Sequence, residues 1–338
     1  MQRGHQEKDN MDELPSTRFI LLGKSGAGKS SLGNTIFGED AFKINYSPVS
    51  DTGLSRAVTR SVHGRRITLI DTPGFFDTER SEEEMKPEIV RCITECTPGP
   101  HAFLIVLKVE KFTKHERAVV DKVRQSFSED ALKYSVIVFT HGDQLSEDIK
   151  IQQFVRQNEN LNDLVQKCGG RCCVVDNKYW KTCEEDSYRS NSFQVAELLN
   201  TVDKMIEANK GSYYTNDMLK EVKREMQREE ERIRRTSEHM SQEEVRDQAI
   251  VGTVDWLMIK SAGIVTGALL EVLLGVTFAF TSEGGTATVV SAAPGWVLKG
   301  GMRGYNASEG ATSPTEAMQM TAEDVKKQFG IAASKKKK

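Results

Sequence analysis

Residues 23 to 30 form a glycine-rich segment of the kind that binds phosphate groups. They read Gly-Lys-Ser-Gly-Ala-Gly-Lys-Ser, which matches GxxxxGK[ST], and the apolar run Phe19–Leu22 precedes them. A strand that ends in such a turn and continues as a helix directs backbone N–H groups and the positive end of the helix at one point, where phosphate oxygens bind. Lys29 would reach the β- and γ-phosphates, and the Ser30 hydroxyl would bind Mg²⁺. The pattern therefore predicts a site for a nucleoside triphosphate.

A second short motif, Asp71-Thr72-Pro73-Gly74, follows the apolar run Arg66–Ile70. Asp71 would complete the shell of the metal ion, and the Gly74 N–H would contact the γ-phosphate. A loop that contacts the third phosphate senses whether it is present. This motif predicts a switch.

One hydroxyl between these two motifs must reach Mg²⁺ when the triphosphate is bound. The polar stretch Ser47–Arg60 supplies the candidates. Thr52 is our choice, and Ser50 is the alternative. We therefore expect metal ligands at Ser30, Thr52 and Asp71, and catalytic roles for Lys29, Thr52 and Gly74.

The choice of base is predicted from two later motifs that also follow apolar runs. Asp143, in Thr140-His141-Gly142-Asp143, can accept two hydrogen bonds from guanine N1 and N2, which adenine does not donate in that geometry. His141 would cover the flat face of the base. Asp176-Asn177-Lys178 would contact guanine O6 through the backbone or through the Asn177 side chain. We expect GTP and GDP as ligands; an ATPase that uses the same loop is the weaker reading.

The elements that position these motifs alternate along the chain. Runs of strand length are separated by helix-length segments, which predicts an α/β fold with a mostly parallel sheet and helices on both faces. Residues 192–209 repeat their apolar positions with a helical period and would close the domain. The expected strands are Phe19–Leu22, Arg66–Ile70, Ala102–Val109, Tyr134–Thr140 and Arg171–Val175.

The composition indicates which kinds of partner and which cellular compartment to expect. The chain has 338 residues, of which 28% are charged, and its net charge of −3 shows no basic excess for nucleic acid, so no nucleic-acid partner is expected. Residues 1–15 are polar, lack the apolar stretch of a secretory signal and are expected to be disordered. We therefore expect a cytoplasmic protein whose six cysteines are core residues and free thiols.

With these motifs, residues 16–214 resemble the GTPases of immunity-associated proteins, called GIMAP or immune-associated nucleotide-binding proteins. The run Pro98–Leu107, PGPHAFLIVL, is specific to that family. The resemblance implies a Ras-like P-loop GTPase fold related to that of septins, and binding of GTP and GDP. It also implies GTP-dependent homodimers or polymers on intracellular membranes and, in many members, a C-terminal hydrophobic anchor.

Carried onto this chain, the resemblance implies a role for each matching residue. It aligns the switch threonine with Thr52, keeps the roles of Asp71 and Gly74, and keeps Asp143 at the base. The phosphate loop that it implies consists of Gly23, Lys24, Ser25, Gly26, Ala27, Gly28, Lys29, Ser30 and Ser31.

Three departures bear on catalysis and on base binding. Phe75 follows Gly74, where small GTPases commonly carry a glutamine that orients water. His141-Gly142 stands where many relatives have arginine and lysine. Lys111 precedes Phe112-Thr113, where family members can carry an arginine that acts in trans, and lysine lacks its planar fork. We therefore expect slow hydrolysis coupled to oligomerisation, with a non-hydrolysing GTP-bound scaffold as the alternative.

Residues 215–250 are predicted to form a charged helical extension. Lys220–Asp247 is dense in both charges. Leu219, Met226, Ile233 and Met240 lie seven residues apart, which is compatible with a coiled coil or with a helix that folds back on the domain.

Residues 251–338 are predicted to form an apolar, glycine-rich tail. The run Ser261–Phe280 has the length of a membrane span, but Glu271 near its middle costs about 2.5–3.5 kcal/mol. Together with Ala287–Leu298 it could form a membrane hairpin, and glycine-rich disorder is the competing view. The terminal lysines, Lys335–Lys338, could meet anionic lipid, act as a di-lysine retrieval signal if the tail is cytosolic and tethered to a membrane, or be simply solvated.

Overall fold

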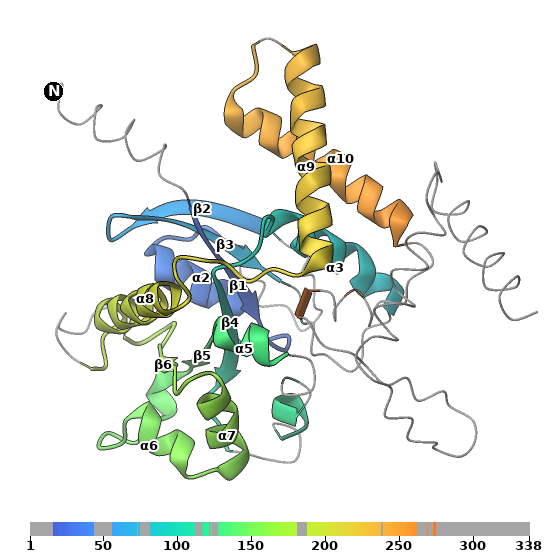
Figure 1. The fold of residues 1–338 in the computed structure, drawn as a ribbon. Helices are drawn as coiled ribbons and strands as arrows, with labels where there is room; N and C mark the ends of the chain where they lie inside the picture. Colours follow the sequence, from blue (N-terminus) through green and yellow to red (C-terminus); the bar gives the residue numbers. More distant parts are fainter. Residues whose placement is uncertain are drawn as a thin grey trace, which may run out of the picture.

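A six-stranded sheet forms the centre of the protein in the computed structural model (Figure 1). The structure describes residues 16–43, 56–72, 74, 82–111, 117–121, 123, 128–180, 188–237, 239–261, 269 and 273–274. The strand order is β2-β3-β1-β4-β5-β6, and only β2 runs antiparallel to its neighbour. The strands are β1 (Thr17–Leu22), β2 (Arg56–Val62), β3 (Arg65–Asp71), β4 (Ala102–Lys108), β5 (Ser135–Thr140) and β6 (Cys172–Val174). The predicted mostly parallel sheet is confirmed.

Strand β2 is not among the expected strands, and most of its residues lie in the polar stretch Ser47–Arg60. It pairs with β3 through a two-residue turn in which His63 and Gly64 have φ of 48° and 74°. Positive φ at both central residues is the geometry that joins two antiparallel strands tightly. β2 lies at the edge of the sheet, so only Val58 and Val62 are buried, and this sparse apolar pattern hid the strand.

Helices cover both faces of the sheet, as predicted. Alternate residues of β1 point to opposite faces: Phe19 and Leu21 pack with α2 and α8, whereas Ile20 and Leu22 pack with α3, α6 and α7. The helices of the domain are α2 (Lys29–Phe37), α3 (Glu82–Glu95), α5 (Glu129–Lys133), the short 3₁₀ helix η1 (Gly142–Gln144), α6 (Ile151–Arg156), α7 (Glu159–Lys167) and α8 (Asn191–Ala208). The predicted closing helix is α8.

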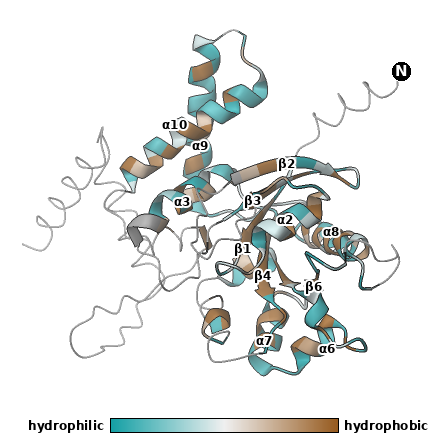
Figure 2. Ribbon diagram, turned by 180° about the vertical axis from the view of Figure 1, so that it is seen from behind, coloured by the Kyte–Doolittle hydropathy of each residue, from teal (hydrophilic) through white to brown (hydrophobic). Residues whose placement is uncertain are grey.

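The charged extension consists of two helices, α9 (Asp217–Thr236) and α10 (Gln242–Lys260), which form a hairpin against α3 (Figure 1). Ser241 starts α10 with a capping box completed by Glu244. Hydrophilic residues predominate in α9, whereas β4 is apolar up to its last residue, Lys108 (Figure 2). Three residues of the seven-residue repeat are buried, namely Leu219, Met226 and Ile233. They pack within this chain, as expected for a helix that folds back. Helix α10 continues to Lys260, past the boundary that we placed between the charged extension and the tail at residue 250.

The run Pro98–Leu107 contacts the C-terminal end of the domain. A Cβ on Gly99 would lie 2.0 Å from the backbone oxygen of Tyr214, so only glycine fits there. The Tyr214 N–H donates to Pro100 O at 2.8 Å, and Arg18 Nε donates to Gly99 O at 2.9 Å. These contacts fix the segment that leads into α9.

Part of the predicted membrane run packs on the domain. Leu269, Leu273 and Leu274 are buried in the same core as α3, and the Ser128 N–H donates to Leu274 O at 3.1 Å. Among the described residues, we find no helix with both the length and the apolar character that a membrane crossing needs. The second apolar piece, the terminal lysines and Cys183 lie outside the described residues. The five described cysteines are free, as expected.

Candidate nucleotide-binding site

The expected site residues meet at one edge of the sheet. The phosphate loop follows β1, Asp71 ends β3, His141 and Asp143 follow β5, and Asn177 follows β6. These four strands are parallel, so their carboxyl ends lie at the same edge. The fold therefore collects motifs that are up to about 150 residues apart.

The phosphate loop has the backbone geometry that its glycines predict. Gly26 and Gly28 have φ of 71° and 88°, and α2 starts at Lys29 directly after them. Lys29 Nζ donates to Gly23 O at 3.1 Å and to Lys24 O at 3.0 Å, and the residue is only 7% exposed. Its ammonium group is thus held across the loop, where a phosphate at the start of α2 would meet it.

Ser30 and Asp71, the two described metal-ligand candidates, are in contact. Ser30 Oγ donates to Asp71 Oδ2 at 2.5 Å. Asp71 Oδ1 is buried and has no hydrogen-bond partner among the residues that the structure describes. Burial raises the pKa of Asp71, although the Ser30 hydroxyl and the Lys29 charge oppose this. A hydroxyl beside a buried carboxylate with an unsatisfied oxygen fits the oxygen ligands that Mg²⁺ prefers.

The structure describes only some of the other residues expected to lie beside the triphosphate. Gly74 is buried, and the Thr72 hydroxyl just before it donates to Leu21 O at 2.6 Å, which anchors the start of the switch segment to β1. Lys111 is exposed at the end of the segment after β4. The expected switch residues Thr52 and Ser50, together with Phe75 and Phe112-Thr113, lie outside the described residues.

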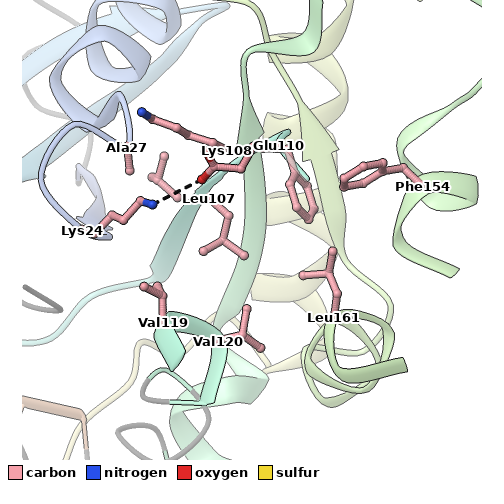
Figure 3. Close-up of a pocket in the computed structure, with 11 residues that line it drawn as sticks. Lys24, Ala27, Leu107, Lys108, Glu110, Val119, Val120, Phe154 and Leu161 are labelled. Carbon is pink, nitrogen blue, oxygen red and sulfur yellow. Dashed lines mark hydrogen bonds and ion pairs between the residues drawn. The ribbon is translucent and has the colours of Figure 1, made fainter. Parts of the chain in front are cut away.

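Lys24 directs its side chain away from the loop and toward β4 (Figure 3). Its Nζ forms an ion pair with Glu110 Oε1 at 3.2 Å, above a cavity of about 30 Å³. The cavity is lined mainly by apolar side chains such as Leu107, Val120 and Phe154. Lys24 thus contributes its backbone, rather than an open ammonium group, to the phosphate loop.

The base motif is tied to the phosphate loop through Thr140, whose hydroxyl donates to Ala27 O at 2.8 Å. His141 is exposed and has φ of 59°. A Cβ on Gly142 would lie 2.5 Å from Cη2 of the buried Trp180. Packing of this tryptophan therefore accounts for glycine at 142, one of the departures from the family pattern.

Asp143 lies beside a second carboxyl group that sequence reasoning did not assign. Asp176 Oδ2 accepts a hydrogen bond from the Asp143 N–H at 3.3 Å. Asp176 Oδ1 accepts from the Lys178 N–H at 2.9 Å and from the Tyr179 N–H. Asp176 therefore shapes both base loops from a position that is 2% exposed.

Asn177 reaches the site with its amide turned toward the phosphate loop. Its Oδ1 accepts from Thr35 Oγ1 at 2.9 Å, and its Nδ2 lies 3.5 Å from Gly28 O. Both ends of the Asn177 side-chain amide are thus engaged by α2 and the phosphate loop.

Asn191 is the other residue that sequence reasoning missed. Its Oδ1 accepts from the Asp176 N–H at 3.1 Å, and its Nδ2 donates to Asp176 O at 2.6 Å. The first residue of α8 thus holds both polar groups of the Asp176 backbone. The start of α8 after Ser190 was readable from the sequence, but nothing in the sequence pointed to this pairing.

Comparison with known proteins places the site in a family context. The model of the AIG1 family matches residues 17–233. The chain is 31% identical over 204 residues to human GTPase IMAP family member 8, covering 60% of this chain and 30% of that protein. It is 33% identical over 216 residues to immune-associated nucleotide-binding protein 1 of Arabidopsis thaliana, covering 62% of this chain and 93% of that protein. Among solved structures, Arabidopsis Toc33 with Mg²⁺ and GMPPNP aligns at 18% identity with a TM-score of 0.42, covering 61% of this chain and 89% of that one.

Proposed function

The chain belongs to the AIG1 family, and from this premise we propose that it is a switch that binds GTP and GDP with Mg²⁺. We further propose that it hydrolyses GTP slowly as an oligomer. One observation carries the proposal: a phosphate loop, a metal-type Ser30–Asp71 pair and the base carboxyl Asp143 lie at a single sheet edge. This arrangement provides for the phosphates, the metal and the base of one nucleotide.

The chemistry follows from what each side chain contacts. Bound Mg²⁺ would neutralise phosphate charge, with Ser30 and Asp71 as its protein ligands. Lys29 would turn its ammonium group from the loop carbonyls to the phosphate oxygens, and the loop N–H groups would hold the rest of the phosphate charge. Asp143 would accept the N1 and N2 hydrogens of guanine, while His141 would cover the ring.

Substitution of the phosphate lysine tests the binding site. Lys29→Ala should abolish retention of GTP and GDP, because no other group replaces its charge at the loop. Lys133→Ala, which removes an exposed lysine of α5, is the matched control and should bind normally. Unchanged GTP affinity in Lys29→Ala would remove the phosphate-loop assignment.

Substitution of the base carboxyl tests the choice of nucleotide. Asp143→Asn should shift preference from guanine toward xanthine, because an amide can donate to the O2 that xanthine carries. Asp130→Asn, at an exposed acid of α5, should leave the preference unchanged. Undiminished selectivity for GTP in Asp143→Asn, or ATP that outcompetes GTP in the wild type, would overturn the assignment.

Hydrolysis and oligomerisation are tested together. A single-turnover rate that rises with protein concentration is expected if a neighbouring copy completes the site. Phe75 and Lys111 favour the alternative of a GTP-bound scaffold, because neither supplies the water-orienting amide or the planar guanidinium. No measurable rate at any concentration, with GTP-dependent assembly retained, would establish that alternative.

Association with an intracellular membrane is the last part of the proposal, and the apolar run 261–280 supports it. The full chain should float with liposomes, and a chain that ends after Lys260 should not. A chain that ends after Phe280 keeps both the run and its three buried leucines, so it should float like the full chain if the run is the anchor. Retention of GTP binding verifies that each chain is folded. Equal flotation of the full chain and the shortest one would contradict a tail anchor.

A further inference from the structure

The sequence motif assigns Asn177 to the base, whereas its side chain lies against the phosphate loop. Its Nδ2 is 3.5 Å from Gly28 O, and its Oδ1 is 2.9 Å from Thr35 Oγ1 on α2. A Cβ on Gly28 would lie 3.1 Å from the same Nδ2. The amide therefore packs directly on the turn where the phosphate loop continues into α2.

Thr140, from the other base motif, contacts the neighbouring peptide of this turn. Its hydroxyl donates to Ala27 O at 2.8 Å, and its Cγ2 would lie 3.3 Å from a Cβ on Gly28. Gly28 O also accepts the Leu32 N–H of α2 at 2.8 Å. Because a trans peptide is planar, with its C=O and N–H on opposite sides, the N–H groups of Gly28 and Lys29 point away from these contacts. They are the N–H groups at the start of α2, where a phosphate binds.

The base loop that carries Asn177 is held independently of this side-chain contact. Asn191 holds both polar groups of the Asp176 backbone, and Asp176 Oδ1 accepts from the Lys178 N–H at 2.9 Å. The residues on both sides of Asn177 are thus fixed whether or not its amide makes a bond. Gly28, by contrast, has φ of 88° and no side chain of its own, so its conformation depends on contacts from neighbouring residues. The amide therefore positions the phosphate loop rather than the reverse.

We propose that Asn177 is a positioning residue for the phosphates, and that its amide sets the preference for guanine nucleotides with a β-phosphate over the monophosphate. The inference rests on the proposed function, because it takes residues 23–31 as the phosphate loop. The backbone of such a loop holds the β- and γ-phosphates. A displaced turn at Gly28 therefore weakens binding of GDP and GTP while the contacts to the base stay in place. A direct contact between the Asn177 side chain and guanine O6 would have the opposite signature.

The test compares GDP with GMP, which carries the same base but lacks the β-phosphate. Each unlabelled nucleotide competes with a fluorescent GDP for the full chain in the presence of Mg²⁺, and the ratio of the two affinities is the readout. In Asn177→Ala, GDP affinity should fall about fivefold to tenfold, which is the size of one net hydrogen bond. GMP affinity should change by less than about twofold.

The partner on α2 supplies a second pair of variants. Thr35→Val removes the hydroxyl that contacts Asn177 Oδ1 but keeps the shape of the side chain, so it should also lower the ratio of GDP to GMP affinity. Thr35→Ser keeps the hydroxyl and should retain the wild-type ratio. Asn200→Ala is the matched control for Asn177→Ala, because it makes the same substitution at an exposed position of α8.

The outcomes distinguish this inference from the proposed function. If the wild type binds neither GDP nor GMP, both fall. If the wild type binds them and Asn177→Ala lowers both affinities by the same factor, the side chain acts on the base, and only the inference falls. Unchanged GDP affinity in Asn177→Ala overturns the inference as well. If Asn177→Ala does not fold, the ratio in Thr35→Val decides: a wild-type ratio overturns the inference, and a lowered ratio that Thr35→Ser restores supports it.

Discussion

Replacement of Asn191 by alanine should strongly destabilise the protein. The side chain makes two hydrogen bonds to the backbone of Asp176, at 3.1 Å to its N–H and at 2.6 Å to its carbonyl oxygen. Asn191 is 7% exposed and Asp176 is 2% exposed, so the substitution leaves two buried backbone groups unpaired. Each costs about 1–3 kcal/mol, or about 2–6 kcal/mol together. This is a large part of the about 5–15 kcal/mol that stabilises a typical domain.

Urea unfolding of the nucleotide-free chain measures this change. Far-UV circular dichroism follows the whole domain, and tryptophan fluorescence includes the signal of Trp180, which packs against Gly142 on the base side. Asn200→Ala is the matched control, because it makes the same substitution on an exposed face of α8 and removes one 3.3 Å contact with Arg65. We expect the control to change the free energy of unfolding by less than about 0.5 kcal/mol.

The same substitution should also weaken nucleotide binding. Asp176 holds the backbone of Asp143, so release of the Asp176 peptide loosens the base loops. GTP affinity should fall in Asn191→Ala and stay unchanged in Asn200→Ala. An unfolding free energy for Asn191→Ala within about 0.5 kcal/mol of the control would refute the reasoning, since it would show that the two buried groups do not depend on Asn191.

Three further predictions follow from single contacts. Gly142→Ala should lower both stability and GTP affinity, because its Cβ would meet the buried ring of Trp180 at 2.5 Å. Gly252→Ala is the control and should be tolerated, because its Cβ would meet only the flexible end of Glu229. Equal melting temperatures of the two variants would contradict this prediction. Asp71→Asn should remove most of the gain in GTP affinity that Mg²⁺ gives to the wild type. GTP titrations with Mg²⁺ and with EDTA measure this gain in both proteins, and an equal gain in the variant would contradict the prediction. Burial and the charge of Arg18 lower the pKa of His101 from 6.5 to about 4, so the folded state is favoured above pH 6.5 and loses stability as pH falls toward 4. His101→Asn should flatten this part of the stability profile, and urea midpoints that fall equally in both proteins would show that other groups cause the loss.

The hairpin of α9 and α10 carries a sequence signal for its second helix. Charge alone in Lys220–Asp247 does not mark where a helix ends. Ser241 followed three residues later by Glu244 is the capping-box pattern that starts a new helix, and the structure uses it to begin α10. Strand β2 lacked such a signal, since an edge strand buries few side chains and its pairing depends on the turn at residues 63–64.

The sequence by itself determined the phosphate loop, the alternation of strands and helices, and the order of the site motifs, because each depends on neighbours within one turn or one strand. Only the tertiary structure decided that Asp176 touches Asp143, that Asn191 holds Asp176, and that Trp180 requires glycine at 142. These pairs are 15 to 38 residues apart, and they meet only because parallel strands β5 and β6 end at the same edge beside the start of α8. Local sequence patterns indicate which residues can bind the nucleotide, whereas long-range packing determines which side chains contact those residues in the folded protein.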